Sequence, residues 1–159
     1  MRRLSFLLLP AIAVSASASD GAPAAGARAA APSATELIAA RQAMMHMAAT
    51  LLFQEVMPLA KSGGEVKPAG HAADGLDLFG HSLAGLFPQG SAGPNSRALP
   101  SVWTNKADFA ARANAFGDAA AQLKRIADSG DKAAFAAQAA VVAKGCGGCH
   151  SLYRAEEKK

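Results

Sequence analysis

The sequence predicts an all-α protein that folds as an antiparallel four-helix bundle. Four stretches have apolar residues recurring at intervals of three and four, and most connections between them are short. No stretch shows the alternation of apolar and polar residues that is typical of a strand. Apolar residues make up 51% of the 159 residues, which is enough to form the core of one domain.

The residues before the first helix have the composition of an export segment. Two arginines precede an apolar run from Leu4 to Val14, and an A-x-A cleavage site follows the run. The run is short for a membrane span and contains Pro10, although an uncleaved anchor is the alternative. We predict a signal peptide over residues 1–18, cleaved after Ala18. Residues 19–32 have almost no large apolar groups and are expected to form a flexible leader.

The bundle domain is expected over residues 33–159, and its first helix over residues 33–58. Ser33 and Glu36 have the spacing of a capping box, and no breaker precedes Pro58. One face of this helix carries Leu37, Arg41, Met45, Ala48 and Leu52.

The second helix is expected over roughly residues 69–86, where the apolar residues are Leu76, Phe79, Leu83 and Leu86. Three glycines each lower its intrinsic stability by about 1 kcal/mol relative to alanine. Residues 87–103 are dense in Pro, Gly, Ser and Asn and predict an ordered loop.

The third helix is expected over roughly residues 103–128 and ends at a Ser-Gly pair. We interpret Trp103 and Phe109 as anchors of the core or the loop. Asp131 is placed to cap the fourth helix. One face of that helix carries Phe135, Gln138, Val142, Cys146, Cys149 and Tyr153.

The charge distribution argues against nucleic acid as a partner. The chain has 16 basic and 12 acidic side chains, and removal of Arg2 and Arg3 with the signal peptide leaves 14 basic ones. The basic residues are scattered and are not interleaved with aromatic residues. A mature charge near neutral also argues against strong electrostatic steering toward one partner.

Cys146-Gly147-Gly148-Cys149-His150 matches C-x-x-C-H, the attachment signature of c-type haem. Positions i and i+3 of a helix place two sulfurs on one side, where both can form thioether bonds to the haem vinyl groups. His150 follows on a neighbouring part of that face, where its imidazole can coordinate the iron. The motif therefore predicts one covalent haem c.

Three other uses of the cysteine pair compete with haem attachment. A disulfide would close a loop too small to affect the unfolded chain much. A thioredoxin-like redox pair requires a βαβ context, which the sequence does not predict. A zinc site lacks a fourth ligand, because His46, His71 and His81 lie far off without ligand spacing. We interpret His71 and His81 as surface residues.

Four motifs resemble those of a known family. They are Arg41-Gln42 in a Met-rich stretch, "LFPQGS" at 86–91, "LPSVW" at 99–103 and "CGGCHSLYR" at 146–154. Over residues 34–156 the chain resembles the cytochrome c′ family, the class II c-type cytochromes. The resemblance implies a left-handed bundle around one haem c with its iron, and a homodimer that is common in the family.

The resemblance also implies roles for individual residues. Cys146 and Cys149 would hold the haem, His150 would be the proximal iron ligand, and Arg154 would lie over or beside its imidazole. Arg41 would approach a haem propionate.

On the distal side, the resemblance implies that Gln42 belongs to the haem pocket and that Phe87 lines it together with Met45. Five-coordinate members of the family have a non-ligating apolar residue at this last position and can bind NO or CO. Low-spin members have a methionine ligand from this helix. Met44 is the next candidate for the ligand, and His46 points about 100° away from Met45 along the helix.

These observations predict a periplasmic electron carrier with His/Met-ligated, low-spin haem, rather than an enzyme. Its partners would be redox proteins of the periplasm, and it would have no membrane span after signal removal. A five-coordinate cytochrome c′ that binds NO or CO at an open distal face is the alternative function. A non-haem helical protein that uses the cysteine pair for redox chemistry or folding is the third.

Overall fold

A computed structural model describes residues 31–157 of the chain. The predicted signal peptide over residues 1–18 lies outside the described residues, as does the predicted leader up to residue 30.

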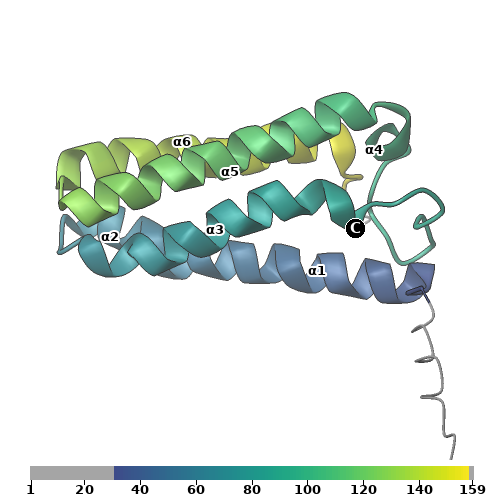
Figure 1. The fold of residues 1–159 in the computed structure, drawn as a ribbon, viewed down its shortest axis with the longest axis horizontal. Helices are drawn as coiled ribbons and strands as arrows, with labels where there is room; N and C mark the ends of the chain where they lie inside the picture. Colours follow the sequence, from purple (N-terminus) through teal and green to yellow (C-terminus); the bar gives the residue numbers. More distant parts are fainter. Residues whose placement is uncertain (1–30, 158–159) are drawn as a thin grey trace, which may run out of the picture. The chain divides into compact units, whose positions relative to one another are not determined.

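Four long helical stretches lie side by side as an antiparallel bundle (Figure 1), which confirms the predicted fold class. The first is α1 (Ala34–Thr50), continued by the π-helical segment Leu51–Val56 and by α2 (Met57–Ser62). The second is α3 (Gly70–Ser82), flanked by 3₁₀ turns at Lys67–Ala69 and Leu83–Leu86. The short helix α4 (Ser101–Thr104) precedes the third, α5 (Lys106–Ser129), and the fourth is α6 (Lys132–Tyr153).

The helix starts at Ser33 and Asp131 are capped as the sequence predicts. The Ser33 hydroxyl accepts a hydrogen bond from the Glu36 amide at 3.3 Å, and the Ser33 amide donates to the Glu36 carboxylate at 2.7 Å. The Asp131 carboxylate accepts from the Ala134 amide at 3.0 Å. These bonds satisfy amide groups that have no partner within the helix.

Two helix boundaries differ from the sequence prediction. The first helix continues past Pro58 to Ser62, and Pro58 directly follows the π-helical segment, at the start of α2, where the hydrogen-bond register changes. The preceding π-helical segment shifts the register, so that the Met57 amide donates to Leu52. The third helix is interrupted at Asn105, which has a non-helical backbone (φ −119°, ψ 46°) between α4 and α5.

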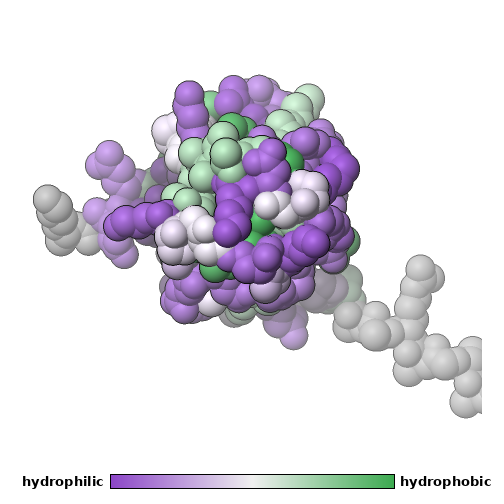
Figure 2. All heavy atoms as spheres, turned by 90° about the vertical axis from the view of Figure 1, so that its left-hand side faces the viewer, coloured by the Kyte–Doolittle hydropathy of each residue, from purple (hydrophilic) through white to green (hydrophobic). Residues whose placement is uncertain are grey.

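Within residues 31–157 there is no strand, and one isolated antiparallel bridge pairs Ala98 with Arg154. The core between the helices contains the fully buried side chains of Phe135, Leu52, Leu76, Leu123 and Val142. The end of the bundle with the α5–α6 turn presents hydrophilic groups interspersed with small apolar patches (Figure 2). In this part of the chain, no helix combines the length and the apolar character needed to cross a membrane.

Helices α3 and α5 approach each other closely at Gly80 and Gly117. A Cβ atom added at Gly80 would lie 2.5 Å from the Gly117 backbone nitrogen and 2.6 Å from its Cα. The ring of His81 covers Gly117 from the outside, since a Cβ atom at Gly117 would lie 2.4 Å from His81 Nδ1. Gly80 therefore allows a contact with the α5 backbone that no larger residue permits, whereas a larger residue at Gly117 would meet the His81 ring.

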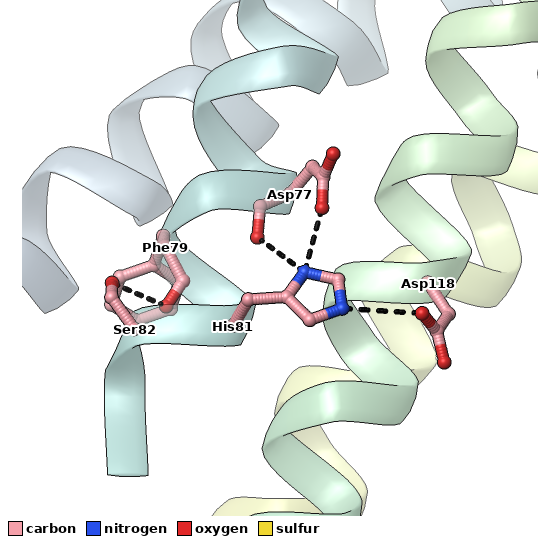
Figure 3. A network of polar contacts seen from close by, with 5 residues as sticks. All are labelled: Asp77, Phe79, His81, Ser82 and Asp118. Carbon is pink, nitrogen blue, oxygen red and sulfur yellow. Dashed lines mark hydrogen bonds and ion pairs between the residues drawn. The ribbon is translucent and has the colours of Figure 1, made fainter. Parts of the chain in front are cut away.

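His81 connects the two helices at this crossing (Figure 3). Its Nδ1 lies 2.7 Å from the Asp77 carboxylate and 3.2 Å from the Asp77 carbonyl oxygen, and its Nε2 lies 3.2 Å from the Asp118 carboxylate. Because the carboxylates are acceptors, both ring nitrogens must carry a proton for both bonds to form. The hydrogen bonds to the Asp77 backbone and side chain accordingly raise the pKa of His81 above 6.5.

This raised pKa predicts a pH-dependent contribution to stability. The contribution is fully present below pH 6.5, the pKa in the unfolded chain, and is lost as the pH rises through the higher folded pKa. The free energy of unfolding, measured with urea between pH 6 and pH 9, should therefore decrease more in the native protein than in His81→Gln. Equal decreases in the two proteins would contradict the prediction.

Candidate haem site

A cavity of about 320 Å³ lies between α1 and the C-terminal part of α6, beside the loop that connects α3 to α4. It brings together all the predicted site residues except Cys146. Its wall consists of Arg41, Gln42, Met45, His46, Ala49, Phe87, Ser96, Arg97, Ala98, Val102, Phe109, Cys149, His150, Tyr153 and Arg154. The volume lies within the range of sites that bind small molecules or cofactors.

Cys146 and Cys149 are both half-buried on α6 and are not joined by a disulfide. Cys149 lines the cavity, whereas Cys146, one turn earlier, packs against the hydrophobic core. Burial raises the pKa of both thiols, so both are protonated at neutral pH. The intervening Gly147 and Gly148 have no atom within 4 Å of where a Cβ would stand, so the helix surface between the thiols is unobstructed.

His150 lies half-buried in the cavity wall. Burial lowers the pKa of its imidazole, and the positive charges of Arg154 and Arg97 lower it further. The ring is therefore neutral at physiological pH, which is the form that coordinates a metal.

Arg41 is a buried cation, with 3% of its surface exposed. Its guanidinium donates to the Ser91 hydroxyl at 3.1 Å, the Ser91 carbonyl at 2.8 Å and the Ser96 hydroxyl at 2.9 Å. It also lies over the Phe87 ring, 4.7 Å from the centroid. Among the described residues no carboxylate forms an ion pair with it, so the cavity wall carries a positive charge that suits a ligand bearing carboxylates.

Gln42 and Phe87 occupy different depths of this wall. Gln42 is exposed, and its side-chain amide donates to the Asn95 carbonyl at 2.8 Å. Phe87 is buried against Trp103 and Phe109, with ring centroids 6.2 and 5.0 Å away. Trp103 in turn donates its indole N–H to the Pro88 carbonyl at 2.9 Å. Gln42 and Trp103 thus hold the loop between α3 and α4 against the cavity through hydrogen bonds to two of its carbonyl groups.

Of the methionines in α1, only Met45 lines the cavity. Met44 is half-buried against the core, and Met47 is 49% exposed. His46 also lines the cavity, which the helical register did not predict, and it does so from an exposed position.

Sequence reasoning missed several residues of the wall. Phe109, interpreted as an anchor of the core or the loop, is buried and also lines the cavity. Tyr153 was placed on the correct helix face but given no role. Its hydroxyl donates to the Asp108 carboxylate, which also accepts from Arg112 at 2.6 Å. Arg97 had no signal, because its position depends on how the loop folds back onto the end of α6.

A family profile described as Cytochrome C′ matches residues 36–154 and so includes the whole cavity wall. The chain belongs to the cytochrome c′ family. Its cofactor is haem c with one iron, as in the other cytochromes c′. The free thiols, the neutral imidazole and the buried guanidinium are a set of groups that fits this cofactor.

Curated relatives of this cytochrome c′ include cytochrome c-554 of Cereibacter sphaeroides, which is 33% identical over 121 residues. That alignment covers 70% of this chain and 90% of the relative. Cytochrome c′ of Pararhodospirillum photometricum is 34% identical over 83 residues, covering 52% of this chain and 66% of the relative. The solved structure of ferric cytochrome c prime from Alcaligenes xylosoxidans aligns with a TM-score of 0.72 at 23% identity. The alignment covers 79% of this chain and 98% of the Alcaligenes chain, so the two proteins share the same fold.

Proposed function

We propose that this cytochrome c′ is a periplasmic electron carrier whose low-spin haem is ligated by His150 and Met45. The observation that carries the proposal is the placement of these two side chains in the wall of one cavity, on two different helices. Cys146 and Cys149 would attach the haem covalently, and Arg41 would pair with a propionate. Phe87 and Gln42 would complete the pocket, and Arg154 would lie beside His150.

The bound haem c would supply the redox chemistry, which is the one-electron Fe(III)/Fe(II) couple. Each protein group contributes to how that couple behaves. The Met45 thioether is a soft ligand that favours the reduced state, and the neutral His150 ring supplies the second ligand. The buried positive charge of Arg41 disfavours the additional positive charge of the oxidised state. If His150 and Met45 both hold the iron, they would leave no open site for bond-making chemistry, so we propose a carrier and not an enzyme.

The export prediction belongs to the same proposal. A signal peptide over residues 1–18, a leader over residues 19–32 and a haem domain over residues 33–159 would deliver the protein to the periplasm, where its redox partner proteins would be found. We propose a homodimer as the assembled form.

Mass spectrometry and absorption spectroscopy of the exported protein test this function. We expect a mass equal to that of the polypeptide plus one haem, a start after Ala18, and a ferric charge-transfer band in the red region from the iron–thioether bond. Two free or disulfide-linked thiols would contradict haem attachment.

Carbon monoxide distinguishes the proposed carrier from a gas-binding protein. A solved relative, cytochrome c prime of Alcaligenes xylosoxidans, has mutants that were captured as nitric oxide complexes. A high-spin ferrous spectrum with rapid CO binding in the native protein would favour that function and contradict the carrier. A low-spin spectrum and slow CO binding are expected.

A further inference from the structure

The end of α6 is fastened to the chain before α4 by a short two-stranded contact, which we name the proximal clasp and define as residues 97–99 and 153–155. The Leu99 amide donates to the Tyr153 carbonyl at 2.9 Å, and the Ala155 amide donates to the Arg97 carbonyl at 2.8 Å. Ala98 and Arg154 are the bridge pair between them. The clasp begins three residues after His150 and therefore fixes the end of the helix that carries it.

The side chain of Arg97 strengthens the same contact. Its Nε and Nη2 donate to the Ala155 carbonyl at 3.0 and 2.8 Å, a two-pronged bond that fixes the plane of the guanidinium. Arg97 also lines the cavity together with His150. Its nearest carboxylate, that of Glu157, is 3.8 Å away and 85% exposed, so its charge is only weakly compensated.

Arg97 and Arg154 both belong to the cavity wall, but only Arg97 has its charge held in place. Both arginines are exposed, but no hydrogen bond or ion pair of the Arg154 side chain is found within residues 31–157. Arg97 is bonded to the backbone on the other side of the clasp. Solvent screens both exposed side chains, but the bonded charge of Arg97 keeps one position, whereas an unbonded charge samples many.

We propose that Arg97 is the positioning residue of the proximal side: through the clasp it fixes the segment that carries His150, and its held charge raises the haem reduction potential. The proposal rests on the proposed ligation by His150 but is independent of the distal ligand. The sign follows from Coulomb's law, because the oxidised iron carries one more positive charge than the reduced iron and a nearby cation disfavours it.

Redox titration of the intact holoprotein tests the electrostatic part. In Arg97→Gln the equilibrium constant for reduction of the haem should fall about threefold, because solvent partly screens the charge. This corresponds to a reduction potential lower by about 30 mV, at 59 mV per tenfold change. Arg97→Lys keeps the charge and should remain close to the native value. The matched control is Arg125→Gln, which also removes an exposed arginine. Arg125 lies near the C-terminal end of α5, about 25 Å along the helix from Asp108 in its first turn.

Electron paramagnetic resonance of the ferric protein tests the positioning part, since low-spin g values depend on the orientation of the axial ligands. They should change in Arg97→Gln and stay native in Arg125→Gln. Glu157 compensates the charge of Arg97 only weakly, so Glu157→Gln should raise the equilibrium constant for reduction by less than about twofold. Arg97→Lys keeps the charge and provides the test that does not depend on how well Arg97→Gln folds.

Equal potentials in Arg97→Gln and Arg125→Gln, or a potential in Arg97→Lys as low as that in Arg97→Gln, would overturn the proposal. A high-spin spectrum of the native protein would instead contradict the low-spin function. In that case the potentials of the Arg97 variants would still decide the role of this arginine.

Discussion

Gly80→Ala should destabilise the bundle by about 3 kcal/mol. The added methyl group would stand 2.5 Å from the Gly117 nitrogen and 2.6 Å from its Cα, and the Ala113 carbonyl oxygen would be 3.0 Å away. All of these atoms belong to the backbone of α5, so no side-chain rotation can relieve the overlap. The two helices would have to separate, and the core packing around them would be lost.

The measurement is the free energy of unfolding in urea, with the haem absorption as a second probe. Gly85→Ala is the matched control, because it lies in the 3₁₀ turn after α3 and no atom is found within 4 Å of its would-be Cβ. Its stability should be within about 1 kcal/mol of the native protein. If the two variants were equally stable, the helices would not meet as closely as described.

Gly117→Ala should be less harmful than Gly80→Ala. The nearest atoms to its added methyl group belong to the ring of His81, which can rotate away. The rotation would break the hydrogen bonds of His81 to Asp77 and Asp118. This variant should therefore also lose the pH dependence that we assign to His81.

Met45→Leu should convert the protein from a low-spin electron carrier into a five-coordinate gas binder. Leucine has about the size of methionine and fills the same part of the cavity, but it has no sulfur with which to bind iron. The ferric charge-transfer band should disappear, and CO should bind to the ferrous protein at least about tenfold faster because no thioether must first dissociate.

Met44→Leu is the matched control for this experiment. Met44 is the neighbouring methionine of α1, packs against the core and does not line the cavity. Its spectrum and CO binding should remain native. An unchanged low-spin spectrum in Met45→Leu would transfer the distal ligand to another residue of the wall, and His46 would be the first to examine.

Local sequence signals predicted the fold, and all the residues that they proposed for the site except Cys146 line one cavity. The capping residues Ser33 and Asp131 act within four residues, and the helical register correctly placed Arg41 and Met45 together and His150 near Cys149. The continuation past Pro58 was missed because a π-helical shift in the preceding turn depends on packing and not on composition.

The remaining errors concern contacts between segments distant in the sequence. Arg97 contacts Ala155, 58 residues further on, and this contact depends on the path of a Pro- and Gly-rich loop. Phe109 was given a packing role only, since the register of a helix defines its apolar face but not which neighbour covers that face. The exposed wall position of His46 likewise depends on how α1 packs beside α6, which the register of α1 alone does not define.

The bonds of Arg41 also resist movement of the loop that covers the cavity. Lifting the loop that contains Ser91 and Ser96 would break three hydrogen bonds and leave a buried charge without partners, so this side of the cavity stays closed. The exposed residues of the wall are Gln42, His46, Ala49, Arg97 and Arg154, so solvent meets the cavity along these residues.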